Sequence, residues 1–115
     1  MSDYKDLEVW KKSIEIVTEI YKLSRSFPES EKFGLTNQMR RAAVSIPSNI
    51  AEGSARHHSK DFIHFLRIAD GSAAELETQL IISRKLGFAD DIETLLNEVI
   101  VVRRMLAALI KSLRK

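Results

Sequence analysis

The chain has 115 residues and a formal net charge of +2, with 44% hydrophobic and 30% charged residues. This length suits a single domain over residues 1–115, and the composition is typical of a folded globular protein rather than a disordered one. The sequence has no cysteine, which excludes disulfides and thiolate metal sites. No apolar run approaches the ~20 residues of a membrane span. The charged N-terminal sequence MSDYKDLEVWKK differs from a signal peptide, so we expect a cytoplasmic protein that does not contact membranes.

Charge is segregated along the chain. Residues 32–60 carry five basic residues and one acidic residue, and residues 99–115 carry five basic residues and no acidic one. Residues 1–31 and 61–98 have net charges of −2 and −5. The basic segments are therefore candidates for contact with nucleic acid, although basic residues at a helix C-terminus also complement the helix dipole.

The first predicted helix runs from about Asp6 to Ser26, before Pro28, and has two neighbouring apolar stripes. One stripe consists of Leu7, Trp10, Ile14, Val17 and Tyr21, and the other of Val9, Ile16, Ile20, Leu23 and Phe27. Together they form an apolar face wider than a simple surface helix needs. This width predicts packing on two sides, with the core of the protein on one side and a neighbouring subunit on the other. Trp10 is thus a structural residue.

The second predicted helix begins near residues 33–36, ends near Ser54 and contains Pro47. A proline inside a helix costs roughly 3 kcal/mol, because it has no N–H and its ring clashes with a carbonyl four residues back. The inner stripe consists of Leu35, Met39, Ala42, Ile46 and Ile50. Pro47 falls opposite this stripe, so we expect it on the outer face, where it kinks the helix around the core. Gly53 suits the end of the helix.

The third predicted helix begins at an N-cap near Ser59 and ends at Gly87, and the fourth begins at Asp90, where Glu93 completes a capping box. Both carry apolar seams with heptad spacing. The seams are Phe62, Leu66, Ala69, Ala73, Leu76, Leu80 and Ser83 in the third helix, and Ile92, Leu95, Val99, Val102, Leu106, Leu109 and Leu113 in the fourth. Four helices without a predicted strand indicate an all-α fold. Because the connections are short, we expect successive helices to run antiparallel, as in an up-down-up-down four-helix bundle.

Small residues occur at matching levels of the second and third helices. A turn near residues 56–58 brings Ala42 and Ala43 level with Gly71. The two patches are Ala42, Ala43, Ser45, Ser48 and Ala51, and Ala69, Gly71, Ser72, Ala73 and Ala74. We expect the two helices to approach closely here, which offsets the costs of Pro47 and of a mid-helix glycine at Gly71.

The sequence contains no recognisable catalytic constellation. None of its serines stands in a nucleophile motif, and there is no Gly-rich phosphate loop. His57, His58 and His64 lack the spacing of metal ligands, and we interpret them as surface residues. We therefore predict a protein that is not an enzyme and has no metal or cofactor.

Arg40 and Arg41, with Arg56 and Lys60, are the candidate nucleic-acid-binding residues, because the planar guanidinium group matches the geometry of phosphate. The alternative is that the arginines form salt bridges inside the bundle. Asp70, Glu75 and Glu77 lie near the level of Arg40 and Arg41, and we interpret them either as solvated or as partners of these arginines. On the last helix, Arg103 and Arg104 are a possible extension of the basic patch.

Four stretches closely resemble one protein family. They are DLEVW at 6–10, FGLTNQMRRAAVSIPSNIAEG at 33–53, DFIHFLRIADGSAAELETQL at 61–80 and LGF at 86–88. The family consists of four-helix-bundle proteins encoded in intervening sequences of bacterial large-subunit rRNA genes. The resemblance implies a four-helix bundle that assembles as a homopentamer, which agrees with the two-sided first helix.

That family is also similar to the accessory variability determinant of diversity-generating retroelements, a basic pentamer that partners a reverse transcriptase and nucleic acid. The similarity implies a nucleic-acid role here, with Arg40 and Arg41 at matching motif positions, although a net charge of +2 is far less basic. We expect a ring-like oligomer that binds RNA or DNA. The alternative is a protein-interaction scaffold or an accessory subunit, for example of a reverse transcriptase, without direct nucleic-acid binding.

Overall fold

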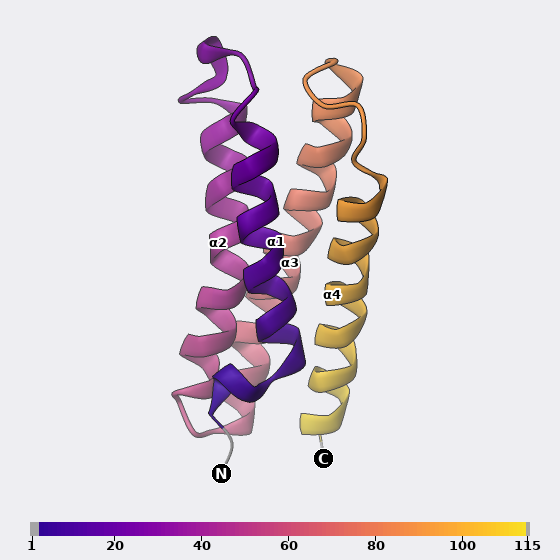
Figure 1. Ribbon diagram of the computed structural model, residues 1–115. Helices are drawn as coiled ribbons and strands as arrows, with labels where there is room; N and C mark the ends of the chain where they lie inside the picture. The colour runs from indigo at the N-terminus through magenta and orange to yellow at the C-terminus, as the bar shows by residue number, and fades with distance from the viewer. Residues whose placement is uncertain (1–2, 115) are drawn as a thin grey trace.

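The structure, a computed structural model, describes residues 3–114 and contains four long helices (Figure 1). They are α1 (Glu8–Ser24), α2 (Leu35–Ser54), α3 (Ser59–Lys85) and α4 (Glu93–Leu113). Two short 3₁₀-helices, η1 (Tyr4–Asp6) and η2 (Glu29–Glu31), precede α1 and α2. No strand occurs within residues 3–114. The predictions of an all-α fold and of four helices are confirmed.

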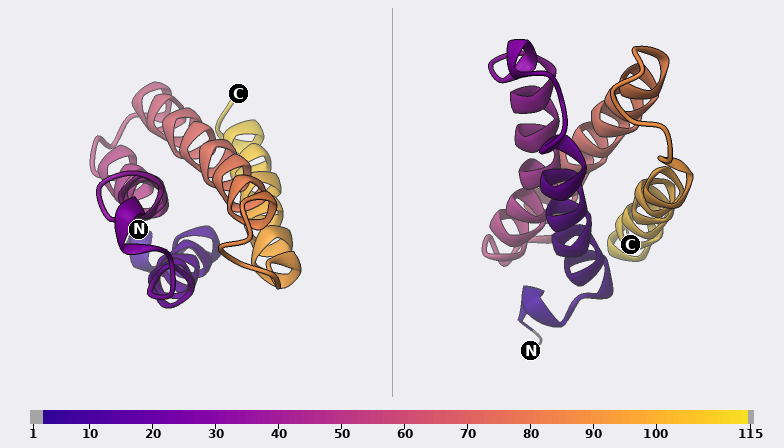
Figure 2. Two further views of the ribbon diagram at one scale, coloured as in Figure 1. Left: turned by 90° about the horizontal axis from the view of Figure 1, so that it is seen from above. Right: turned by 45° about the horizontal axis from the view of Figure 1, so that its top comes forward.

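The four helices lie side by side in an elongated body of 45 × 23 × 19 Å, and the chain reverses direction at each connection (Figure 1). Seen from above, α1 and α2 form one side of the body, and α3 and α4 form the other (Figure 2). Two contacts set the register of α2 on α3. The hydroxyls of Ser45 and Ser72 lie 2.8 Å apart, and the hydroxyl of Ser83 donates to Met39 Sδ at 3.3 Å. Residue numbers therefore rise along α2 as they fall along α3.

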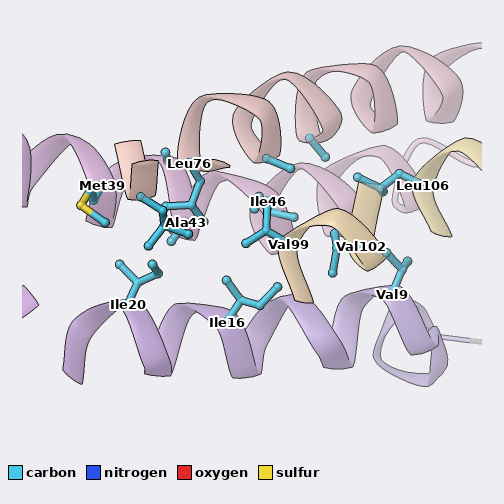
Figure 3. Packing of buried hydrophobic residues seen from close by; sticks show 14 of the residues in the cluster. Val9, Ile16, Ile20, Met39, Ala43, Ile46, Leu76, Val99, Val102 and Leu106 are labelled. Carbon is cyan, nitrogen blue, oxygen red and sulfur yellow. The ribbon is translucent and has the colours of Figure 1, made fainter. Parts of the chain in front are cut away.

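The hydrophobic core runs along the body between the four helices. On α1, it takes up the stripe that contains Ile16 and Ile20, both completely buried. Figure 3 shows these side chains pointing from α1 toward those of α2 and α4. The other stripe of α1 lies at the surface, since its residues Ile14 and Tyr21 are 39% and 40% exposed. One of the two predicted packing faces is thus used by the chain itself.

The ends of α3 differ from the prediction. His58 is the N-cap residue in place of Ser59, and its side chain makes no capping hydrogen bond. The helix ends at Lys85, two residues before Gly87. Gly87 has φ of +78°, a left-handed conformation that glycine adopts without steric cost, so it ends the helical path.

The predicted capping box of α4 is wrong. The helix begins at Glu93, with Ile92 as its N-cap residue and no side-chain cap, so Asp90 precedes the helix by three residues. The carboxylate of Glu93 instead accepts a hydrogen bond of 2.6 Å from Arg84 Nη1. Because Arg84 is in the last turn of α3, this contact joins the end of one helix to the start of the next.

Pro47 is buried, so its predicted place on the outer face is wrong. The helix α2 continues through it to Ser54, and its ring lies beside α1, where Trp10 and Val17 line the same shallow groove. The prediction assumed that only the inner stripe of α2 is covered. Because α2 packs against both α1 and α3, a second face is covered as well. Burial of the proline ring offsets part of the cost of its missing N–H.

At Gly53, rather than at Gly71, α2 and α3 are too close to leave room for a side chain. A Cβ atom at Gly53 would lie 2.7 Å from Phe65 Cβ and 3.0 Å from Phe62 Cδ1. A Cβ atom at Gly71 would meet no heavy atom within 4 Å, and Gly71 is exposed. The predicted role of Gly71 in close packing is therefore wrong, because residue 71 faces away from α2. Ala42 and Ala43 are both buried.

The two glycines should respond in opposite ways to alanine. We expect Gly53→Ala to lower the free energy of unfolding by about 1–3 kcal/mol, because the added methyl overpacks the contact with Phe65. We expect Gly71→Ala to raise it by about 0.5–1 kcal/mol, because alanine favours the helix and meets open space. Urea unfolding of the two variants checks both values, and a destabilised Gly71→Ala would contradict the packing.

Candidate nucleic-acid interface

Arg40 and Arg41 line an open groove between the C-terminal half of α1 and the N-terminal half of α2. The groove is lined by Tyr21, Asn37, Arg40, Arg41, Val44 and Ser45. None of these residues is acidic. The groove therefore offers hydrogen-bond donors and positive charge, which is the chemistry that phosphate oxygens require.

Arg40 is held in place by α1. Its Nε donates to the Ser24 hydroxyl at 2.8 Å, and its Cζ lies 4.6 Å from the centre of the Tyr21 ring. The Ser24 hydroxyl donates in turn to the carbonyl of Ile20 at 2.7 Å, which fixes its orientation. Arginine has five N–H donors, so this arrangement positions the Arg40 guanidinium and leaves donors for a ligand.

Arg41 is exposed and forms no ion pair with the described residues. It also lines a second groove, on the α3 side of α2, together with Gln38, Ala42, Ser45, Ser72 and Glu75. Arg41 thus stands between an acid-free groove and a groove that contains the Glu75 carboxylate.

Asp70 and Glu77 do not pair with the arginines of α2, which was one of the alternatives that the sequence left open. Both acids bind Arg103 of α4, with Arg103 Nε 2.9 Å from Asp70 Oδ1 and Nη1 3.3 Å from Glu77 Oε1. These acids are one heptad apart on α3 and face α4 rather than α2. The hydrogen bond to Asp70 is the main cause that raises the pKa of Arg103 above its ordinary value, with the negative charges of both acids adding to it and burial opposing it.

Arg103 therefore does not extend the basic groove of α2, which the sequence had left as a possibility. Its guanidinium is committed to two carboxylates, and the neighbouring Arg104 is exposed on the same helix. Within the described chain, α4 lies beside α1 and α3 rather than beside α2. Arg104 thus belongs to a different surface from Arg40 and Arg41.

Arg56 and Lys60 lie at the other end of α2 from Arg40 and Arg41. Arg56 pairs with Glu52 at 2.9 Å and stacks over Phe65, with Cζ 5.0 Å from the ring centre. Lys60 is exposed in the first turn of α3. The path along α2 from Arg41 to Ser54 is about 20 Å. The structure therefore divides the four predicted residues into two separate pairs.

An apolar groove continues from the arginine groove along α1 and α2. It is lined by Tyr4, Trp10, Ile14, Val17, Val44, Pro47, Ser48 and Ala51. Val44 belongs to both grooves, and no charged residue lines the apolar one. Trp10 is half-buried and packs edge-on against Tyr4, with ring centres 5.5 Å apart. The surface stripe of α1 thus forms one continuous strip with α2.

Four residues of the arginine groove were absent from the predicted set: Tyr21, Asn37, Val44 and Ser45. Asn37, Arg41 and Ser45 are spaced four residues apart, so they share one face of α2. This spacing was a signal available in the sequence. Tyr21 gave no such signal, because its contact with Arg40 depends on the register of α1 against α2.

The histidines lie outside the arginine groove. His57 and His58 line a pocket at the α2–α3 turn together with Asp3 and Tyr4, and His64 packs edge-on against Phe65. Within residues 3–114, no group of three or more histidine, aspartate or glutamate residues is arranged to hold a metal ion. Across the same residues, no helix combines the length and apolar character needed to cross a bilayer.

The described chain is thus a small all-helical protein with four helices and an acid-free arginine groove on one side. Its sequence matches the family model of 23S rRNA-intervening sequence proteins over residues 5–108, so the chain belongs to this family. The family resemblance inferred from the sequence motifs is confirmed.

A solved structure supports the same relationship. It is the crystal structure of a protein of unknown function from the S23 ribosomal protein family of Bacteroides thetaiotaomicron, with 29% identity and a TM-score of 0.80. The alignment covers 90% of this chain and 98% of that one. No curated protein matches the sequence.

Arg40 and Arg41 should differ in their effect on stability. We expect Arg40→Ala to lower the free energy of unfolding by about 1–2 kcal/mol, because it removes the hydrogen bond to Ser24 and the contact with Tyr21. We expect Arg41→Ala to change it by less than about 0.5 kcal/mol, since an exposed side chain without a partner is lost. Urea unfolding measures both, and equal losses would contradict the different roles of the two arginines.

Proposed function

We propose that this protein is a non-enzymatic, cytoplasmic homopentamer that binds RNA or DNA through basic residues. In this proposal each protomer is an up-down-up-down antiparallel bundle with α2 bent at Pro47, and the protomers form a ring. The observation that carries the proposal is the groove in which Arg40 and Arg41 stand together without an acidic lining residue. Guanidinium groups in such a setting suit phosphate, the sequence-independent part of any nucleic acid.

The apolar strip along α1 and α2 supports self-association. Ile14 and Val44 are each about 40% exposed, and both line the apolar groove. Contiguous exposed apolar surface that is rimmed by polar residues is typical of a protein interface. A head-to-tail interface closes into a ring when its rotation permits. A ring of five copies would turn a weak basic groove into a multivalent surface.

The second candidate is a protein-interaction scaffold or accessory subunit, for example of a reverse transcriptase, without direct nucleic-acid binding. Two observations favour it. The net charge of the protomer is only +2, and the apolar strip could accept a different protein as well as a second copy. The two candidates differ in one measurable property, which is affinity for nucleic acid in the absence of any other protein.

Binding to structured RNA should be measurable at low salt and should weaken as salt rises. We expect the logarithm of the association constant to fall linearly with the logarithm of salt concentration, because bound arginines release counterions from phosphates. A titration from about 50 to 200 mM salt measures the slope. Absence of binding at the lowest salt would favour the scaffold.

The mass in solution tests the ring and its interface. We expect light scattering at micromolar concentration to give five times the chain mass of 13.1 kDa. Ile14→Glu should dissociate the oligomer, because it places a charge in the apolar strip. Ile68→Glu is the matched control, since Ile68 is 40% exposed on α3, away from the strip. A single-chain mass for the unaltered protein would contradict the ring, and dissociation by Ile68→Glu would contradict the choice of interface.

A further inference from the structure

We propose that the arginine groove binds the phosphodiester backbone of double-stranded nucleic acid and makes no contact with the bases, so that binding is independent of sequence. This inference rests on the proposed function and specifies the form of nucleic acid that the groove accepts. Three features of the groove carry it: the kind of hydrogen-bonding groups, the position of Tyr21, and the acid next to Arg41.

The groups that remain available in the groove are mainly donors. Arg40 and Arg41 provide guanidinium N–H groups. The Ser45 hydroxyl already accepts from Asn49 Nδ2 at 2.9 Å and shares a hydrogen bond of 2.8 Å with Ser72. Reading of base edges uses both donors and acceptors. Asn37 and the Tyr21 hydroxyl are the lining groups that offer both, whereas the two guanidinium groups offer donors alone, so most of the hydrogen-bonding capacity of the groove suits phosphate oxygens.

Tyr21 is the aromatic residue of the groove, and its ring is in contact with Arg40. The Arg40 Cζ lies 4.6 Å from the ring centre, and Arg40 Nε is fixed on Ser24 at 2.8 Å. The ring face under the guanidinium is therefore covered. Proteins that bind single strands without sequence preference stack successive bases on free aromatic faces. This groove instead presents a fixed cation, which suits the regularly spaced phosphates of a duplex.

Glu75 is the acid that competes with phosphate for Arg41. It lines the second groove beside Arg41, whereas Asp70 and Glu77 are paired with Arg103. A carboxylate close to a cation lowers the affinity of that cation for another anion. Removal of the negative charge at Glu75 should therefore strengthen binding, although Glu75 itself contacts no phosphate.

The experiment measures fluorescence anisotropy with the full chain and three labelled probes of equal length: two duplexes of scrambled sequence and one single strand. We expect equal affinity for the two duplexes and weaker binding of the single strand. Arg41→Gln should weaken binding to both duplexes equally. It should also reduce the slope of the logarithm of the association constant against the logarithm of salt concentration by about 1 for each protomer that contacts the duplex. Arg104→Gln, with the same change of charge on α4, should leave affinity within about two-fold.

The acid next to Arg41 gives an independent measurement. We expect Glu75→Gln to raise duplex affinity by about two-fold or more at low salt, where electrostatic effects are largest. The matched control is Glu98→Gln, which removes an acid from the groove between α1 and α4. An equal gain from both variants would show an effect of net charge alone and would overturn the role of Glu75.

The outcomes separate this inference from the proposed function. No binding of any probe by the unaltered protein would overturn both. Binding that Arg41→Gln leaves unchanged, or that Arg104→Gln weakens equally, would overturn the groove and leave the proposed function standing. A preference for one duplex that is lost in Asn37→Ala, or tighter binding of the single strand, would overturn backbone-only recognition. Arg41 is exposed and unpaired within the described residues, so Arg41→Gln should fold normally, which circular dichroism checks.

Discussion

The close packing of α2 against α3 is the constraint on which the rest of the structure depends. At Gly53 the two helices approach so closely that a methyl group would collide with Phe65. Further along, Ser45 meets Ser72, and Met39 meets Ser83. These contacts leave α3 no freedom to rotate or slide by a turn. They therefore decide which residues of α3 face α2 and which face α4.

The orientation of α3 about its own axis determines which charged side chains of the surface pair with one another. Asp70 and Glu77 face α4 and neutralise Arg103, so they are not available to the arginines of α2. Had α3 been rotated by one residue, about 100°, the same acids would have met different partners. Asp70 and Glu77 do not neutralise Arg41, because both acids pair with Arg103 of α4 instead.

The helix α1 contributes in two ways. Its buried stripe completes the core (Figure 3). Its surface stripe lines both grooves together with α2. Through Ser24 and Tyr21 it also holds Arg40, so one arginine of the adjacent pair is fixed and the other is free. Adjacent residues on a helix point about 100° apart, so they meet different surroundings even when their chemistry is the same.

The sequence by itself determined the four helices, the two apolar stripes of α1, the seams of α3 and α4 and the family. The helices, stripes and seams follow from local periodicity, which each segment carries without reference to the others, and the family follows from the quoted motifs. Tertiary structure alone decided that Pro47 is buried, that Gly53 rather than Gly71 marks the close contact, and that Arg103 takes the acids expected beside Arg40 and Arg41. It also separated Arg56 and Lys60 from those two arginines. The physical reason is that burial and ion pairing depend on which neighbour covers each face of a helix, and the spacing of residues within one helix does not contain that information.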